Sequence, residues 1–210
     1  MQTTTRRRLA MSAALMGVAA LSGAQTIFDN IQGYTGWNTT TWTEVRGALN
    51  TPRIVGMQFE ASSTAFATSM DLSIQAQLAG SVGGTVNLFA DSGSNTLGTF
   101  MHSVSFPTQP VLGSTGHVTV ALPSLLMTSG QKYWAVTNAD GLFGMLFWHI
   151  PPSSTIGNMY TTASAASPGT YSQELQPGLR ITGDPVPEPA TLVALGMGAA
   201  ALLRRRLRRA

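Results

Sequence analysis

The 210-residue sequence contains no cysteine. This absence excludes disulfide bonds, thiolate metal sites and a thiol nucleophile. Charge is also scarce, because Asp, Glu, Lys and Arg make up 10% of the chain, against about 25% in a typical soluble protein. Ser, Thr, Asn, Gln and Gly supply the polarity instead, as is typical of exported β-proteins with surfaces rich in hydroxyl and amide groups.

Long apolar runs are missing as well. The two apolar segments near the ends, residues 9–21 and 190–203, contain 13 and 14 residues. A membrane-spanning helix needs about 20. As permanent anchors both segments would be weak, so each is better interpreted as part of a targeting signal.

The first segment has the layout of a secretory signal peptide. A positive region, Arg6 to Arg8, precedes the apolar run, and Ser22-Gly-Ala24 supplies small residues for signal peptidase. We therefore predict a signal peptide over residues 1–24, cleaved between Ala24 and Gln25. An uncleaved N-terminal anchor helix is the alternative, and the short apolar run disfavours it.

The second segment lies between a polar hinge and a basic cluster. Pro187, Glu188 and Pro189 precede the apolar run. Five arginines follow it: Arg204, Arg205, Arg206, Arg208 and Arg209. Basic residues beside a hydrophobic helix favour the cytoplasmic side of a membrane. This order places the preceding chain outside the cytoplasmic membrane, with the C-terminal helix inserted transiently.

The segment from Val186 to the end closely resembles the PEP-CTERM sorting signal. The resemblance implies processing near Pro187–Pro189 by exosortase, a membrane protease-transpeptidase of Gram-negative bacteria that make extracellular polysaccharide. It further implies delivery to the cell surface or extracellular matrix and association with exopolysaccharide in a biofilm. It implies no enzymatic activity, because unrelated domains carry the same tail.

Without the two signals the charge balance reverses. The formal net charge of +3 includes eight arginines in the terminal segments. Residues 25–188 keep four cationic and nine acidic side chains, a net charge of −5. A basic surface for nucleic acid is therefore excluded.

The region between the signals predicts an all-β fold. Apolar residues recur with period two, and turn residues interrupt them every 8 to 15 positions. We predict one antiparallel β-sandwich, jelly-roll-like, over residues 25–183. It is flanked by an N-terminal signal helix and by a C-terminal hydrophobic sorting helix within residues 184–210.

Three details of this sandwich follow from the pattern. Residues 65–78 alternate so that Met70, Leu72 and Ile74 face the core while Ser73 and Gln75 face away. Residues 85–90 are predicted to pair back on that strand. Residues 132–137 and 144–149 are predicted to form a hairpin across the turn at residues 138–141.

A second resemblance covers most of residues 25–182. Segments 86–93, 125–130 and 132–136, with Phe147-Trp148, are similar to bacterial choice-of-anchor domains. Those surface modules look like β-sandwiches and have no assigned activity.

Metal and cofactor sites find little support in the sequence. His102, His117 and His149 form no metal-binding motif, so we expect solvent-facing strand histidines rather than a zinc site. Asp91-Ser-Gly-Ser-Asn95 alternates oxygen ligands as calcium loops do, but the distal glutamate is missing. An Asx-type hairpin turn explains the same residues. We predict no metal and no cofactor.

A hydrolase is the least supported class. A glycosidase needs two carboxylates about 5 to 9 Å apart, and the candidate acids are few: Asp29, Glu44, Glu60, Asp71 and Asp140. No Gly-x-Ser-x-Gly elbow is present. We expect no catalytic residues.

Aromatic side chains offer the best indication of binding. Tyr34, Trp37 and Trp42 lie among Thr and Asn residues, where exposed rings could stack on sugars. Trp134 and Phe147 are expected in the core. The leading hypothesis is therefore a non-enzymatic surface or matrix protein, with a carbohydrate-binding module and a hydrolase as alternatives.

Overall fold

The computed structural model describes residues 23–31, 41–47, 52–76, 82–109, 117–141, 144–152, 154–163 and 169–186. Within these residues the chain forms strands and no helix. The strands are β1 (Gln25–Asp29), β2 (Trp42–Arg46), β3 (Ile54–Glu60), β4 (Ala65–Leu72), β5 (Ile74–Ala76), β6 (Val82–Asp91), β7 (Leu97–Gln109), β8 (Val118–Met127), β9 (Lys132–Ala139), β10 (Met145–His149), β11 (Ile156–Thr162), β12 (Thr170–Leu175) and β13 (Leu179–Pro185). All their pairings are antiparallel, which confirms the predicted all-β class.

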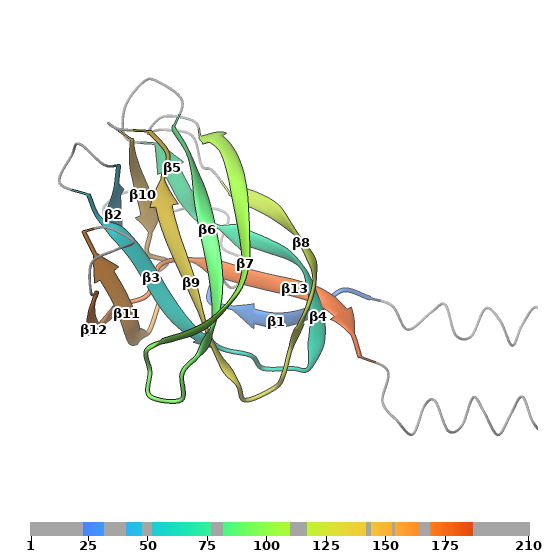
Figure 1. The fold of residues 1–210 in the computed structure, drawn as a ribbon. Helices are drawn as coiled ribbons and strands as arrows, with labels where there is room; N and C mark the ends of the chain where they lie inside the picture. The colour runs from blue at the N-terminus through green and yellow to red at the C-terminus, as the bar shows by residue number, and fades with distance from the viewer. Residues whose placement is uncertain are drawn as a thin grey trace, which may run out of the picture.

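The strands form three sheets around one interior (Figure 1). The largest has the order β12-β11-β3-β9-β6-β7, and a four-stranded sheet has the order β1-β13-β4-β8. A short sheet, β2-β10-β5, completes the enclosure. The strands of the four-stranded sheet run across those of the largest sheet in Figure 1, as in sandwiches whose layers pack at a large angle.

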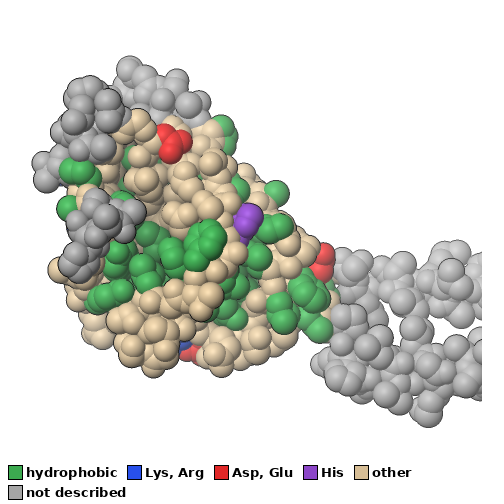
Figure 2. Space-filling model, viewed as in Figure 1, with side chains coloured by type: hydrophobic (Ala, Val, Ile, Leu, Met, Phe, Trp, Pro, Cys, Tyr) green, Lys and Arg blue, Asp and Glu red, His purple; other side chains and the backbone are tan. Residues whose placement is uncertain are grey.

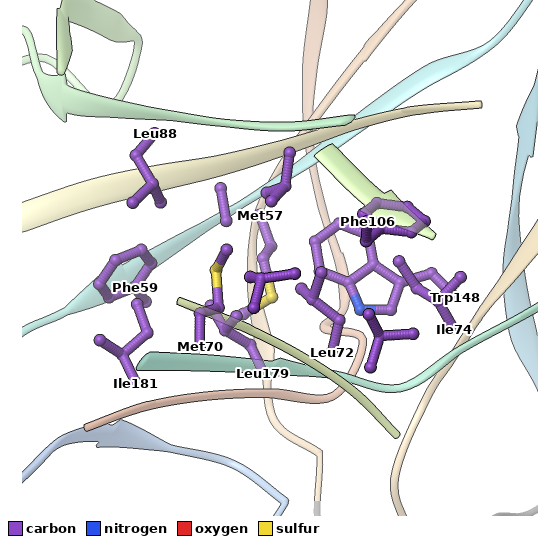
Figure 3. Packing of buried hydrophobic residues seen from close by; sticks show 14 of the residues in the cluster. Met57, Phe59, Met70, Leu72, Ile74, Leu88, Phe106, Trp148, Leu179 and Ile181 are labelled. Carbon is purple, nitrogen blue, oxygen red and sulfur yellow. The ribbon is translucent and has the colours of Figure 1, made fainter. Parts of the chain in front are cut away.

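One hydrophobic core joins the sheets (Figure 3). Met57, Phe59 and Leu88 contribute from the six-stranded sheet, while Leu179 and Ile181 lie opposite them on β13. Each of these five side chains is at most 3% exposed. Burying one such side chain stabilises the fold by about 1.5–3 kcal/mol, so this contact between layers dominates the stability.

The chain changes sheet at Ser73, which separates β4 from β5. The Ser73 hydroxyl donates to the backbone oxygens of His149 (2.8 Å) and Gly178 (3.1 Å). Gln75 lies opposite Phe147 in β10 and is 1% exposed. Burial of Met70, Leu72 and Ile74 confirms half of the predicted alternation. The outward placement of Ser73 and Gln75 was wrong, because β5 is buried on both of its faces and the Ser73 hydroxyl bonds to buried backbone where the chain changes sheet.

Two predicted strand pairings are also wrong. Strand β9 pairs with β3 and β6, whereas β10 pairs with β2 and β5 in another sheet. Strand β6 pairs with β7 and β9 rather than with β4. Strands β9 and β10 are neighbours in the sequence, but each pairs with strands that precede both of them in the chain.

Strand β13 lies between β1 and β4, and Gln25 pairs with Gly183. The first and last strands of the domain therefore meet at one edge (Figure 1). The predicted signal helix and sorting helix lie outside the described residues. Within the described part of the chain, no helix is long and apolar enough to cross a membrane.

Candidate functional site

A polar hollow opens between two neighbouring turns, the β6–β7 turn and the β8–β9 turn. Its volume is about 350 Å³. The hollow is lined by Ala90, Asp91, Gly93, Asn95, Gly130, Gln131, Lys132 and Tyr133. A carboxylate, two amides and an ammonium group therefore converge with backbone groups, a set that suits a ligand rich in hydroxyl groups.

Asp91 organises one wall of the hollow. Its Oδ1 accepts hydrogen bonds from the Gln58 side chain (2.7 Å) and from Trp134 Nε1 (2.8 Å). Its Oδ2 accepts from the backbone N–H groups of Gly93 (2.7 Å) and Asn95 (3.3 Å). The last two bonds form an Asx-type turn, which is the structure that the sequence favoured over a calcium loop.

Hydrogen bonding decides the charge state of Asp91. Burial acts to raise the pKa of this carboxyl, but the bonds from Trp134, Gly93, Gln58 and Asn95 together outweigh burial and lower its pKa. The carboxylate is therefore ionised at neutral pH and fixed in place. Its four acceptor positions are all occupied, so Asp91 shapes the hollow by holding the turn and the Trp134 ring in place.

Asn95 and Lys132 also line the hollow. Asn95 adopts a left-handed conformation with φ of 56°, which asparagine tolerates better than most residues. Its side-chain oxygen accepts from Lys132 Nζ (3.0 Å) and from Gln58 (3.2 Å). A side-chain hydrogen bond thus links the β6–β7 turn to strand β9, in addition to the backbone pairing within the sheet.

An aromatic cluster lies on the outer side of the six-stranded sheet, close to the hollow. The Trp134 ring packs edge-on against Tyr171, with centroids 5.6 Å apart, and Tyr160 lies 5.3 Å from the same tyrosine. Tyr171 is 43% exposed and its hydroxyl accepts from the Leu97 N–H. Tyr171 is not among the predicted binding residues, since a lone tyrosine in a polar strand carries no signal.

The predicted glycan-binding aromatics are only partly described. Tyr34 and Trp37 lie outside the described residues. Trp42 is half-buried at the start of β2, and its ring lies 4.7 Å from the ring of Phe147. One face of Trp42 therefore contacts the protein itself. Trp134 and Phe147 are at most 2% exposed, which confirms the expected core placement.

The three histidines occupy different environments. His102 is half-buried on β7, and His117 is exposed before β8. His149 is fully buried, with Nε2 2.7 Å from the side-chain oxygen of Gln75. The expectation of a solvent-facing His149 was wrong, again because β10 is covered on both sides. Among the described residues no cluster of His, Asp and Glu could hold a metal ion.

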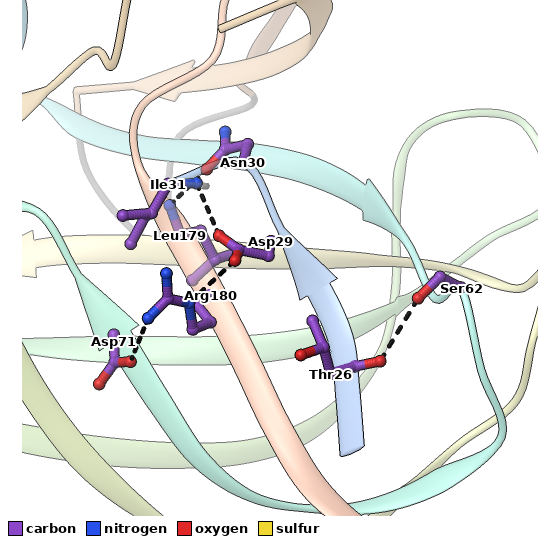
Figure 4. Close-up of polar contacts among 8 residues, drawn as sticks. All are labelled: Thr26, Asp29, Asn30, Ile31, Ser62, Asp71, Leu179 and Arg180. Atoms are coloured by element: carbon purple, nitrogen blue, oxygen red, sulfur yellow. Dashed lines mark hydrogen bonds and ion pairs between the residues drawn. The ribbon is translucent and has the colours of Figure 1, made fainter. Parts of the chain in front are cut away.

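Two of the candidate acids share an arginine in the four-stranded sheet (Figure 4). Arg180 lies opposite both Asp29 and Asp71 in the strand register, and its guanidinium reaches them at 3.0 and 4.0 Å. Asp71 also accepts a hydrogen bond from the Thr119 hydroxyl at 2.6 Å. These contacts tie together β1, β13, β4 and β8, so the acids have a clear structural use.

The signal-processing residues lie at the ends of the domain. Ala24 is exposed and Gln25 begins β1. The sorting residues Pro187, Glu188 and Pro189 and the five terminal arginines lie outside the described residues. Cleavage between Ala24 and Gln25 stays a prediction.

Comparison with known proteins identifies the C-terminal segment. Residues 185–209 match the family model for the PEP-CTERM protein-sorting motif. No curated protein matches the chain. The chain is thus a PEP-CTERM sorting-domain protein and an exosortase substrate. It is exported to the cell surface or extracellular space after transient membrane anchoring.

Proposed function

Because the chain is exported and sorted by its C-terminal motif, we propose that it is a non-catalytic protein of the cell surface or extracellular matrix that binds extracellular polysaccharide. The observation that carries the proposal is the polar hollow beside Asp91. The Asn95 amide and the Lys132 ammonium group supply hydrogen-bond donors for sugar oxygens, while the Asp91 carboxylate holds the turn that carries Asn95 in place. Few precisely placed polar groups are what orient a ligand in such sites.

One face of the domain suits the same role. Figure 2 shows few charged side chains on this face, with hydrophobic side chains in a band across it. Such a surface contacts the C–H faces of sugars without the cost of stripping water from many charges. Exposed Tyr171 adds a ring close to the turn that bears Asp91, through its contact with Leu97.

Affinity electrophoresis in gels that contain a neutral polysaccharide tests this proposal. The Asn95→Gly variant removes the amide and keeps the left-handed backbone accessible. We expect at least tenfold weaker retardation for Asn95→Gly than for the unmodified protein. Ser94→Ala, in the same turn but outside the lining of the hollow, is the control and retains binding. Failure of the unmodified protein to bind any neutral polysaccharide contradicts the proposal.

A carbohydrate-binding module built on Tyr34, Trp37 and Trp42 is the second candidate. Trp42 supports it because this ring is half-buried on β2, an edge strand of its sheet. The same gels separate the two sites, since Trp37→Ala and Trp42→Ala would then abolish binding while Asn95→Gly would not. The hydrolase alternative gains no support from Asp29 and Asp71, because both acids form ion pairs with Arg180.

A further inference from the structure

A second hollow, of about 320 Å³, lies near the edge of the six-stranded sheet that is opposite to β7. We call it the arginine groove. It is lined by Arg46, Pro52, Arg53, Thr161, Thr162, Ala163 and Thr170. From this geometry we infer that the arginine groove binds a carboxylate of an acidic polysaccharide.

The first support is the concentration of positive charge. Residues 25–188 contain only four cationic side chains, and two of them line this groove. The backbones of Arg46 and Arg53 exchange two hydrogen bonds, of 2.9 and 3.1 Å, across an isolated bridge. This bridge holds the two arginine residues side by side.

The second support is the charge that is left over. Glu44 pairs with Arg46 and neutralises it. No ion pair joins Arg53 to any described residue. The groove therefore offers about one uncompensated positive charge, which matches a single carboxylate better than a doubly charged phosphate. A guanidinium also forms two parallel hydrogen bonds with a carboxylate.

The third support is the composition of the walls. Thr161 lies opposite Thr170 in the pairing of β11 with β12, and Thr162 lies opposite Ile54, next to Arg53. Threonine hydroxyls both donate and accept hydrogen bonds, as the hydroxyls of a sugar ring require. Pro52 and Ala163 add small apolar surfaces. The volume is at the lower end of the range for small-ligand sites, about 300–1,000 Å³, so the groove suits a short stretch of chain.

The net charge of the domain determines where an acidic polysaccharide could bind. At −5 for residues 25–188, the protein as a whole repels a polyanion. Binding of an acidic polysaccharide therefore needs a local site, and its affinity decreases with added salt. The inference goes beyond the proposed function, because it concerns a different class of polysaccharide and different residues from the hollow beside Asp91.

Affinity electrophoresis of the exported protein in gels that contain polygalacturonate tests the inference. We expect Arg53→Gln to weaken retardation at least tenfold, and Arg53→Lys to keep part of the affinity because it keeps the charge. Ser105→Glu is the matched control. This substitution lowers the net charge by the same amount, at an exposed position of β7 on the opposite edge of the sheet. The variant should bind as the unmodified protein does. All variants share the same tail, so any retained tail arginines affect them equally.

The outcomes distinguish the two proposals. Equal retardation of Arg53→Gln and the unmodified protein overturns the arginine groove, as does failure of the unmodified protein to bind polygalacturonate. Neutral-polysaccharide binding that is lost in Asn95→Gly would still support the proposed function in either case. Thermal unfolding of each variant checks that it is folded. If Arg53→Gln is unfolded, Arg53→Lys, which keeps the charge but loses the fork, replaces it and is expected to bind more weakly.

Discussion

Asp91 connects the turn between β6 and β7 with a buried tryptophan through one carboxylate. Two backbone N–H groups and two side chains donate to it. Trp134 is fully buried, and Asp91 is the acceptor that satisfies its indole N–H. The same residue thus shapes the hollow and completes the core behind it.

Replacement of Asp91 by alanine leaves the Trp134 N–H without this acceptor. A buried donor left unsatisfied costs about 1–3 kcal/mol, so we expect Asp91→Ala to lower the free energy of unfolding by about 2 kcal/mol. Urea denaturation followed by tryptophan fluorescence measures it. Ser94→Ala, an exposed neighbour, should change stability by less than about 0.5 kcal/mol. Equal stability of the two variants would refute the role assigned to the carboxylate.

At the scale of elements, β13 is central to the four-stranded sheet. It pairs with β1 on one side and β4 on the other, and Leu179 and Ile181 are fully buried. The strand is also the last described element before the sorting residues. The domain therefore completes its fold only when its final strand is in place.

A chain that ends before β13 tests the importance of this strand. We expect residues 25–178 to remain unfolded, because β1 and β4 lose their common partner and the core loses two large side chains. Residues 25–186, which retain β13, should fold cooperatively. Far-ultraviolet circular dichroism and thermal unfolding compare the two chains. Cooperative unfolding of the shorter chain would show that β13 is dispensable.

At the scale of the whole molecule, acidity acts against the fold in two steps. Partial desolvation lowers the pKa of His117 below its ordinary 6.5, with Asp71 raising it and Arg180 lowering it. The pKa of Asp91 lies below its ordinary 3.8. In both cases the unfolded chain binds the proton more readily than the folded one, so falling pH favours unfolding.

The titration of His117 and Asp91 should therefore not change the urea concentration at the unfolding midpoint above pH 6.5. The midpoint should decrease as His117 titrates below that value, and again as Asp91 titrates below pH 3.8. The variant His117→Asn should lose the first decrease and keep the second. A midpoint that rises on acidification from pH 7 would contradict both assignments.

The sequence by itself determined the route of the protein and the class of its fold. The sorting segment is local and ordered along the chain, so its match needs no tertiary contact. The period-two pattern predicts strands for the same reason, and it also placed Met70 and Leu72 in the core. Turn chemistry at residues 91–95 correctly indicated an Asx-type turn.

Only the tertiary structure decided which strands pair and which polar residues are buried. Pairing partners far apart in sequence, such as β9 with β3, are chosen by the packing of both faces, and a single sequence does not record that choice. Gln75 and His149 are buried because β5 and β10 are covered on both faces, and Ser73 because it lies where the chain changes sheet, which a two-faced alternation could not predict. The hollow beside Asp91 and the arginine groove likewise exist only because separate turns and strands meet in space.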